Sequence, residues 1–447
     1  MPAFDGRFQY SGPGTSQEGP CRVQFDAQTF TLTPQQGVPI AFDLGDLDAV
    51  VKGDWELRLP LYTGRAILLR QFGKAFEDLC RDLLEAYRKR AIQCLLLEDL
   101  EEIERFTGTF ELTAAGRASR SGPAEFRLYK SNLAVLPTAE QAFQWRLADL
   151  DTVRFDPANY EVVLECGPDR LKATRLAKRT EEFASRVRDA MAHTATRSAQ
   201  SLHAVFPFLS PDQLQATVSL MKEGRAVPVS KLEAIHPKTA AALTSNAVDK
   251  DLKPYYEHLL SRTATGMLYA GFKLIRPEDK GGADTSSETG GGSESSSDAE
   301  DIVGAPDADP DVPQALYWFF FPIAASPGAK QAANLVAWEA SSSSGRATYF
   351  FRLTDPTQPA QLQDLAWVET AIRHLNRVLG MLNFRRRPLY LSEDELAMNP
   401  QFHRYAIAAR RIPELRQVRA NLLGRAMHSS VDEWQTQVAS ILGKAGL

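Results

Sequence analysis

The sequence predicts an α+β protein in which strands and helices are segregated along the chain. The stretch up to residue 195 contains one strand-rich pattern twice, and each copy ends in an amphipathic helical segment. The C-terminal half then contains helices, further strands and helices again. The predicted architecture is two small barrels, each capped by a C-terminal helix, followed by a helical spacer and a C-terminal antiparallel sheet plus helices.

The internal repeat appears when two segments are aligned. Residues 21–50, CRVQFDAQTFTLTPQQGVPIAFDLGDLDAV, align without a gap with residues 124–153, AEFRLYKSNLAVLPTAEQAFQWRLADLDTV, and the apolar positions coincide. Flanking segments match in the same order: FDGRF with FTGTF before them, and DWELRL with NYEVVL after them. Because order and spacing persist although few identities do, we predict a duplicated domain.

Each copy is predicted to contain short strands followed by one helix. Short alternating runs bounded by Gly, Pro and Asp are typical of half-buried antiparallel strands. Residues 72–90 and 176–194 instead carry apolar side chains at three- and four-residue steps, as on one face of a helix. The two stripes consist of Phe72, Phe76, Leu79, Leu83 and Tyr87 in the first copy, and of Leu176, Thr180, Phe183, Val187 and Met191 in the second.

This order of elements resembles the pleckstrin-homology (PH) superfold, a small barrel closed by a C-terminal helix. The resemblance rests on element order and repeat length, and it implies tandem PH-like domains at residues 1–100 and 101–196. Many PH-like domains bind phosphoinositides through basic residues around the first hairpin. The first copy has none there, whereas the second offers a candidate anion-binding set, with ordinary solvated loop charge as the alternative: Arg117, Arg120 and Arg127.

An Asp-x-Asp pair in each copy raises the question of a divalent-metal site, because Mg²⁺ and Mn²⁺ prefer carboxylate oxygens. Asp46 and Asp48 align with Asp149 and Asp151, and neither pair has a third carboxylate or His nearby in the sequence. The neighbouring Leu and Val residues are predicted to face inward. We therefore expect the Asp side chains to point outward and bond backbone amides at a strand end. No metal or cofactor is expected.

The middle of the chain is predicted to be a helical spacer, residues 197–262, followed by an α+β domain at 263–384. Within that domain, residues 277–313 are Gly, Ser, Asp and Glu with almost no large apolar side chains, so we expect a disordered acidic insertion. A regulatory tether and a passive loop both fit this composition. The strands flanking the insertion are expected to pair, and the domain could be a third PH-like unit.

The last part, residues 385–447, is predicted to be a basic helical tail with two helices broken near Pro413. Its clustered arginines are candidates for contacts with nucleic-acid phosphates, an anionic membrane, the acidic insertion or carboxylates of a protein partner. A basic face that meets only solvent is the simplest alternative. The candidate residues are Arg385, Arg386, Arg387, Arg410 and Arg411.

The sequence favours a binding protein over an enzyme, although it does not exclude an enzyme. It has no phosphate-binding loop, dinucleotide fingerprint, nucleophile elbow or H-E-x-x-H motif. The net charge of −5 is mild, and no run of apolar residues is long enough for a transmembrane segment. Scattered cysteines predict buried thiols in the cytoplasm: Cys21, Cys80, Cys94 and Cys166. We expect a scaffold for protein–protein interaction; the alternative is a nucleic-acid or anionic-membrane binder.

Overall fold

The computed structural model of the chain describes residues 3–12, 14–114, 118–275, 315–324, 326, 328–341, 346–353, 365–400 and 402–446. These residues form three antiparallel sheets and a set of helices, which confirms the α+β class. The chain divides into two compact units: unit 1 is Met1–Met191 with Glu393–Ile412, and unit 2 is Ala192–Ser392 with Pro413–Leu447. The acidic insertion predicted at 277–313 and Arg117 lie outside the described residues.

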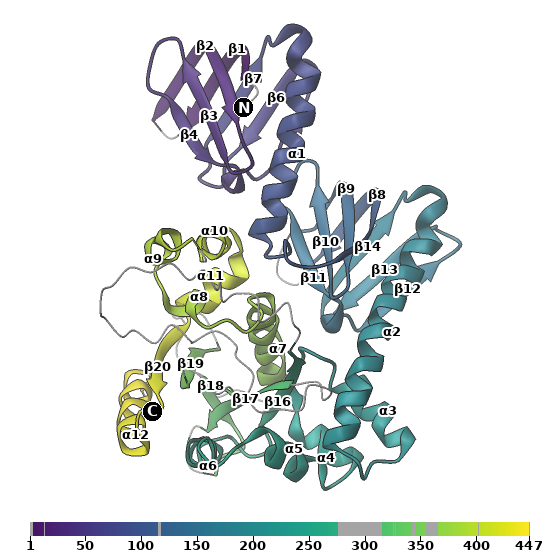
Figure 1. The fold of residues 1–447 in the computed structure, drawn as a ribbon, viewed down its shortest axis with the longest axis vertical. Helices are drawn as coiled ribbons and strands as arrows, with labels where there is room; N and C mark the ends of the chain where they lie inside the picture. Colours follow the sequence, from purple (N-terminus) through teal and green to yellow (C-terminus); the bar gives the residue numbers. More distant parts are fainter. Residues whose placement is uncertain are drawn as a thin grey trace, which may run out of the picture. The chain divides into compact units, whose positions relative to one another are not determined.

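Unit 1 contains two seven-stranded antiparallel sheets with the same strand order (Figure 1). The first sheet has the order β4-β3-β2-β1-β7-β6-β5, and the second has the order β11-β10-β9-β8-β14-β13-β12. The strands of the first sheet are β1 (Ala3–Gly12), β2 (Thr15–Phe25), β3 (Thr29–Pro34), β4 (Ile40–Asp43), β5 (Val51–Lys52), β6 (Glu56–Pro60) and β7 (Ala66–Arg70). Those of the second are β8 (Glu102–Thr113), β9 (Arg120–Tyr129), β10 (Asn132–Pro137), β11 (Phe143–Arg146), β12 (Thr152–Asp156), β13 (Glu161–Cys166) and β14 (Asp169–Thr174).

Short helices occur at matching places in the two sheets. A 3₁₀ helix follows the fourth strand of each, η1 (Leu44–Asp46) and η3 (Leu147–Asp149). After the last strand, a second 3₁₀ helix leads into a long α-helix: η2 (Gly73–Ala75) precedes α1 (Phe76–Cys94), and η4 (Ala177–Arg179) precedes α2 (Thr180–Val205). The two predicted apolar stripes are buried against their sheets, apart from the half-buried Met191.

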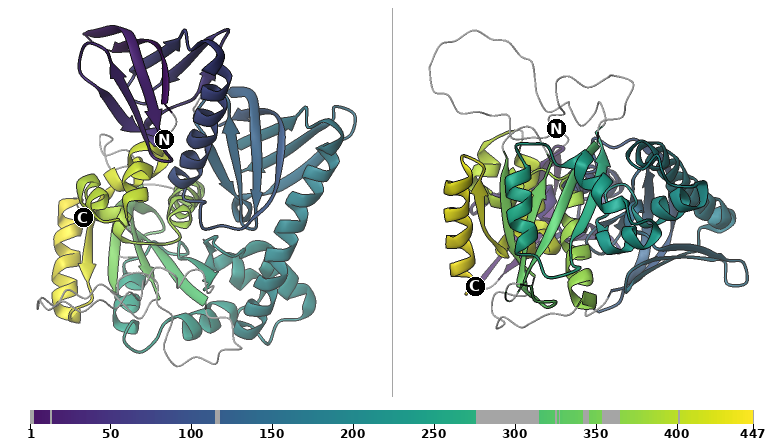
Figure 2. Two further views of the ribbon diagram at one scale, coloured as in Figure 1. Left: turned by 45° about the horizontal axis from the view of Figure 1, so that its top comes forward. Right: turned by 90° about the horizontal axis from the view of Figure 1, so that it is seen from below.

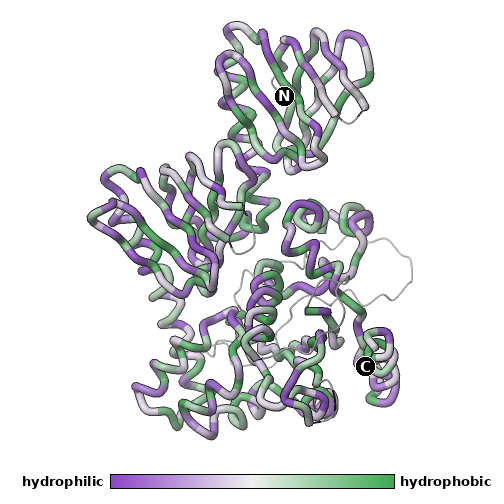
Figure 3. The backbone as a smooth tube through the Cα atoms, turned by 180° about the vertical axis from the view of Figure 1, so that it is seen from behind, coloured by the Kyte–Doolittle hydropathy of each residue, from purple (hydrophilic) through white to green (hydrophobic). Residues whose placement is uncertain are grey.

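The core of each sheet follows from the alternation of side chains along its strands. In Figure 3 hydrophilic and hydrophobic residues alternate along the strands, as expected when one face is buried. Val23, Phe30 and Leu32 are completely buried in the first sheet, and so are Phe126 and Leu133 in the second. Separate apolar cores therefore support the two sheets.

A glycine in the first strand of each sheet makes room for the residue that precedes the capping helix. A Cβ on Gly6 would lie 2.7 Å from the Phe72 ring. A Cβ on Gly108 would lie 2.6 Å from the carbonyl oxygen of Thr174 and 2.8 Å from Leu176. These distances are too short for a real Cβ, so the matched Gly in FDGRF and FTGTF permits the same close approach in both sheets.

Unit 2 is built on a six-stranded antiparallel sheet with the order β15-β16-β17-β18-β19-β20. Its strands are β15 (Val227–Pro228), β16 (Tyr269–Leu274), β17 (Ala315–Ala324), β18 (Ala332–Ala340), β19 (Ala347–Arg352) and β20 (Leu422–Met427). Its further helices are α3 (Pro211–Leu220), α4 (Val229–Ile235), α5 (Thr239–Ala247), α6 (Lys253–Ser261), α7 (Leu365–Met381), α8 (Arg387–Tyr390), α11 (Pro413–Ala420) and α12 (Val431–Lys444). Figure 2 shows α12 beside β20 at one edge of the sheet.

Helices cover both faces of this third sheet, which explains its nearly continuous apolar strands. Residues of α5 and α6 share one core with Phe319 and Phe321. On the opposite face, Trp318 donates a 3.1 Å hydrogen bond to Asn376 of α7 and packs on Phe384 with ring centroids 3.9 Å apart. All nine residues of β18 are consequently buried.

Three details differ from the sequence-based expectations. The capping helix α2 is one continuous helix that runs past residue 197, where the spacer was predicted to begin. Residues 422–427, predicted as part of a helical tail, form strand β20, because they pair with β19 at the edge of the sheet. The third sheet is a simple meander whose order differs from that of the first two sheets, although the predicted pairing of β16 with β17 is confirmed.

Candidate functional site: the seat of α10 on the first sheet

A helix from the C-terminal part of the chain belongs to unit 1 and packs beside the first sheet. Unit 1 takes in α9 (Glu393–Met398) and α10 (His403–Arg411). Pro413, which opens α11, cannot continue a preceding helix, so α10 ends at Arg411, as the predicted break near Pro413 requires. Its Arg410 and Arg411 meet the aspartates of the first Asp-x-Asp pair.

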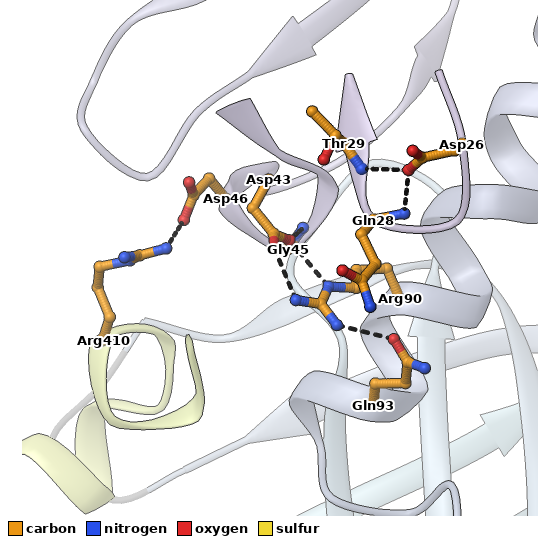
Figure 4. A network of polar contacts seen from close by, with 9 residues as sticks. All are labelled: Asp26, Gln28, Thr29, Asp43, Gly45, Asp46, Arg90, Gln93 and Arg410. Carbon is orange, nitrogen blue, oxygen red and sulfur yellow. Dashed lines mark hydrogen bonds and ion pairs between the residues drawn. The ribbon is translucent and has the colours of Figure 1, made fainter. Parts of the chain in front are cut away.

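Asp46 and Asp48 lie at and just after η1, and Asp43 stabilises this turn of the backbone. Asp43 ends β4, and its carboxylate accepts a 2.7 Å hydrogen bond from the backbone nitrogen of Gly45, which caps η1. Arg90 of α1 binds the same carboxylate through two nitrogens, Nε at 2.8 Å and Nη2 at 2.6 Å, and gives its remaining nitrogen to Gln93 (Figure 4). This two-pronged ion pair fixes η1 against α1.

The two ion pairs of α10 differ in burial. Arg410 donates a 2.5 Å hydrogen bond to Asp46, and both side chains are largely buried. Arg411 donates a 2.7 Å hydrogen bond to the half-exposed Asp48 and a second one, 3.2 Å long, to the carbonyl oxygen of Leu47. The C-terminal end of α10 is therefore held by two carboxylates and one carbonyl, all acceptors suited to positive charge at a helix C-terminus.

Apolar and aromatic contacts also hold α10 in place. We call the surface on which α10 packs the seat, and it consists of Gly45, Asp46, Leu47, Asp48, Tyr62 and Cys94. The guanidinium carbons of Arg410 and Arg411 lie 5.5 and 5.2 Å from the centre of the Tyr62 ring. A Cβ on Gly45 would lie 2.9 Å from Ile407 of α10 and 2.7 Å from the Cys94 sulfur. The seat is thus shaped as well as charged.

A second contact lies at the other end of α10. Arg404 donates 2.6 Å hydrogen bonds to both Glu98 and Asp99, in the loop that follows α1. Beside it is a polar cavity of about 260 Å³. The cavity is lined by Gln28, Arg90, Gln93, Glu98, Pro400, His403 and Arg404. Segment 393–412 therefore meets the first sheet and α1 through three arginines.

Burial affects the protonation of the groups in the seat. Burial raises the pKa of the Asp46 carboxyl, and the charge and hydrogen bond of Arg410 offset only part of that rise. Burial would lower the pKa of Arg410, but Asp46 raises it above its ordinary value. Burial also raises the pKa of the Cys94 thiol to about 12. The seat is consequently a desolvated site in which charge is stabilised only by its partner.

The second sheet uses the equivalent aspartates differently. Asp151 accepts a 2.7 Å hydrogen bond from the backbone nitrogen of Gly167, as predicted for an aspartate at a strand end. Asp149 is buried, so the expectation that it points outward is wrong, because the carboxylate ends η3 rather than an exposed strand. Asp46 and Asp48 bind arginine side chains instead of backbone amides. Among the described residues no group of three or more His, Cys, Asp or Glu is placed to hold a metal ion.

The remaining candidate arginines have acceptors within the chain. Arg120 donates to Glu140 at 2.7 Å and to the carbonyl oxygen of Gln141, and Arg127 donates to Glu125 at 2.6 Å. With Arg117 outside the described residues, the proposed anion-binding set stays a prediction. In unit 2, Arg386 is buried, and Arg385 and Arg387 flank it in sequence where α7 gives way to α8.

Two exposed aromatic residues occupy matching hairpins of the two sheets. Trp55, between β5 and β6, is 68 % exposed, and Tyr160, between β12 and β13, is 64 % exposed. Both have left-handed backbone, with φ of 60° and 50°. A bulky residue in this conformation costs about 1 kcal/mol or more. Neither exposure nor backbone geometry is favourable for folding at these two positions.

Unit 2 contains a buried polar cluster that no sequence motif predicted. The Thr348 hydroxyl donates to Glu339 at 2.6 Å and accepts from the Trp434 indole at 2.9 Å. The Nε2 atom of His428 lies 3.1 Å from both Thr348 and Glu339, and Tyr255 stacks on its ring. Both polar partners contact the same imidazole nitrogen, and among the described residues the other nitrogen of His428 has no partner that would orient the ring as a base. The cluster joins β18, β19 and α12.

Sequence reasoning identified Asp46, Asp48, Arg410 and Arg411 as charged residues but did not pair them. Asp43 and Arg90 were not singled out, because Asp43 ends a strand and Arg90 lies on the buried face of α1, where an apolar residue is expected. The available signal was complementarity: an acidic pair and a basic pair, each beside apolar residues. The four cysteines are buried, as predicted. No described helix has the length and apolar character needed to cross a membrane.

Comparisons with known proteins add only weak similarity. No protein-family model matches the chain, and no curated protein matches it. A solved structure of the N-terminally truncated linker-DH/PH domains of p115-RhoGEF is similar to 27 % of this chain, with 9 % identity and a TM-score of 0.17. The matched part spans about half of that structure, 47 %. A likeness at this level carries no argument about fold or function.

Proposed function

We propose that this chain is a non-enzymatic interaction protein of the cytoplasm, built from two tandem PH-like domains that arose by duplication. The support is the agreement of element boundaries: η1 and η3, and α1 and α2, begin at positions that the sequence alignment pairs. The remaining parts proposed are a helical spacer at 197–262, an α+β domain at 263–384 and a tail at 385–447. The four buried thiols support the compartment.

The observation that carries the interaction role is the pair of exposed hairpin aromatics. Trp55 and Tyr160 stand at aligned positions, and each keeps a large apolar surface in water on strained backbone. Aromatic side chains dominate the binding energy of protein interfaces. Retaining two such residues at a cost to folding is therefore explained by contact with a protein partner.

A nucleic-acid or membrane partner is less well supported. Phosphate binding needs accessible positive charge, but Arg410 and Arg411 are committed to Asp46 and Asp48, and Arg386 is buried. The anion-binding alternative would rest on the other arginines of the C-terminal region, among them Arg385 and Arg387 beside the buried Arg386. We therefore place the protein partner first.

Site-specific photo-cross-linking tests this proposal. A benzophenone amino acid at position 55 or 160 should capture the same protein, whereas the same probe at Val38, which is equally exposed on another turn of the first sheet, should not. The variants Trp55→Asn and Tyr160→Asn should abolish capture from the other hairpin without lowering the melting temperature, because Asn tolerates left-handed backbone. Capture that is unchanged in both variants would refute the role of these residues.

A further inference from the structure

The seat of α10 is a receptor surface that the chain fills with its own helix. Segment 393–412 packs on residues more than 300 positions away in sequence, and the chain on both sides of it belongs to unit 2. The apolar side chains of Tyr405 and Ile407 are buried, and beside them three arginines reach four carboxylates on or next to α1 and η1.

We propose that the seat binds an arginine-bearing amphipathic helix of a protein partner, and that α10 holds the site closed until such a helix displaces it. This inference rests on the proposed interaction function and names one surface and one kind of ligand for it. The ligand has the features of α10: an arginine pair at its C-terminal end, a branched apolar residue one turn earlier, and small residues between them.

The shape of the seat selects this ligand. Gly45 leaves space that Ile407 fills against Cys94, and a side chain on Gly45 would close it. Asp46 binds Arg410, whereas Asp48 and the carbonyl oxygen of Leu47 bind Arg411. The seat therefore binds two adjacent arginines at once. The Tyr62 ring lies under both guanidinium groups and favours arginine over lysine.

Several features make α10 displaceable. Three of the buried residues of α10, Ala406, Ala408 and Ala409, have small side chains, so Tyr405 and Ile407 supply most of the apolar area of its buried face. Among the described residues, the buried Nε atoms of Arg410 and Arg404 have no hydrogen-bond acceptor, so the docking is incompletely satisfied. The carboxylates of Asp99 and Asp48 are partly exposed, so salt weakens the ion pairs that they form with Arg404 and Arg411. Pro413 separates α10 from α11, so the two segments do not form one continuous helix.

A labelled peptide of residues 393–412 provides the test, with the full-length protein as receptor. The wild-type chain should bind it weakly, because the covalently attached α10 competes at high effective concentration. The variant R410E/R411E should bind it at least about ten-fold more tightly. In the variant D46K/D48K, the wild-type peptide should fail to bind, and a peptide carrying R410E and R411E should bind instead.

Three outcomes would overturn the proposal. One is failure of the peptide to bind R410E/R411E while that chain keeps the wild-type melting temperature and circular dichroism. Another is failure of the charge-reversed peptide to bind D46K/D48K. The third is concentration-dependent dimerisation of the wild-type chain that D46K/D48K abolishes, since the occupant would then be a second copy of this chain. None of these results affects cross-linking from Trp55 or Tyr160, so a failure here is distinguishable from a failure of the proposed function.

Discussion

The ion pair between Arg90 and Asp43 should be a principal stabiliser of the first sheet, and Arg90→Met tests it. The Arg90 side chain is 4 % exposed and that of Asp43 is 19 % exposed. Removing one member of a buried pair costs about 3–5 kcal/mol, because the other charge is left unpaired. Asp43 keeps some access to water and the hydrogen bond from Gly45. We therefore expect Arg90→Met to lower the free energy of unfolding of this region by about 2–3 kcal/mol.

A double-mutant cycle separates the pair from the side chains that form it. Asp43→Asn should cost about 3 kcal/mol, since it leaves the more deeply buried guanidinium without its carboxylate. The double variant R90M/D43N should be no less stable than either single variant, which gives a coupling energy of at least about 2 kcal/mol. Arg81→Met is the matched control on the same helix: Arg81 is 67 % exposed, and its loss should cost less than about 0.5 kcal/mol.

Native-state hydrogen exchange of the full-length protein, resolved to peptides covering β3, β4 and α1, measures these free energies without requiring two-state unfolding of the whole chain. The reasoning fails if Arg90→Met costs no more than Arg81→Met, or if the two single effects add in R90M/D43N.

Three further predictions concern the sheets and the seat. Gly6→Ala and Gly108→Ala should each lower the free energy of unfolding by about 1–3 kcal/mol, because the new Cβ would overlap Phe72 or Thr174. The control Gly122→Ala should be tolerated, because its Cβ would approach nothing closer than 3.9 Å. Equal melting temperatures for all three variants would contradict this prediction. Cys94 should resist iodoacetamide at pH 8, since its thiol is buried and has a pKa of about 12. R410E/R411E should expose Cys94 but not Cys166, as read by mass spectrometry; equal protection in both chains would mean that α10 had not moved. Burial raises the pKa of Asp46 in the folded state, so the contribution of Asp46 to the free energy of unfolding falls as pH rises through that pKa. Hydrogen bonds from Thr29 and Gln28 lower the pKa of Asp26, so the contribution of Asp26 rises with pH. As pH rises from about 3 to about 7, the free energy of unfolding of Asp46→Asn should therefore increase relative to wild type, and that of Asp26→Asn should decrease, as measured by urea denaturation. If the two differences changed with pH in the same direction, the assignment would be refuted.

Periodicity and alignment predicted part of the local structure of unit 1. The stripe from Phe72 to Tyr87 is buried as expected, and the alignment of residues 21–50 with 124–153 places η1 opposite η3. Strand β20 was not predicted, because the sequence LLGRAM is equally compatible with the end of a helix. It forms a strand because it pairs with β19. The pairing between Arg410 and Asp46 was not predicted for a related reason: the fold joins residues 364 positions apart, and complementary charge in one sequence does not specify which arginine meets which aspartate.

The distance along the chain between the seat and its occupant has a consequence for synthesis. A ribosome adds about 5–20 residues per second, so the 364 positions from Asp46 to Arg410 take roughly 20–70 s to translate. The first sheet has a self-contained core and can fold within that interval, whereas α10 does not yet exist. Every nascent chain therefore presents an open seat to the cell until α10 has been synthesised.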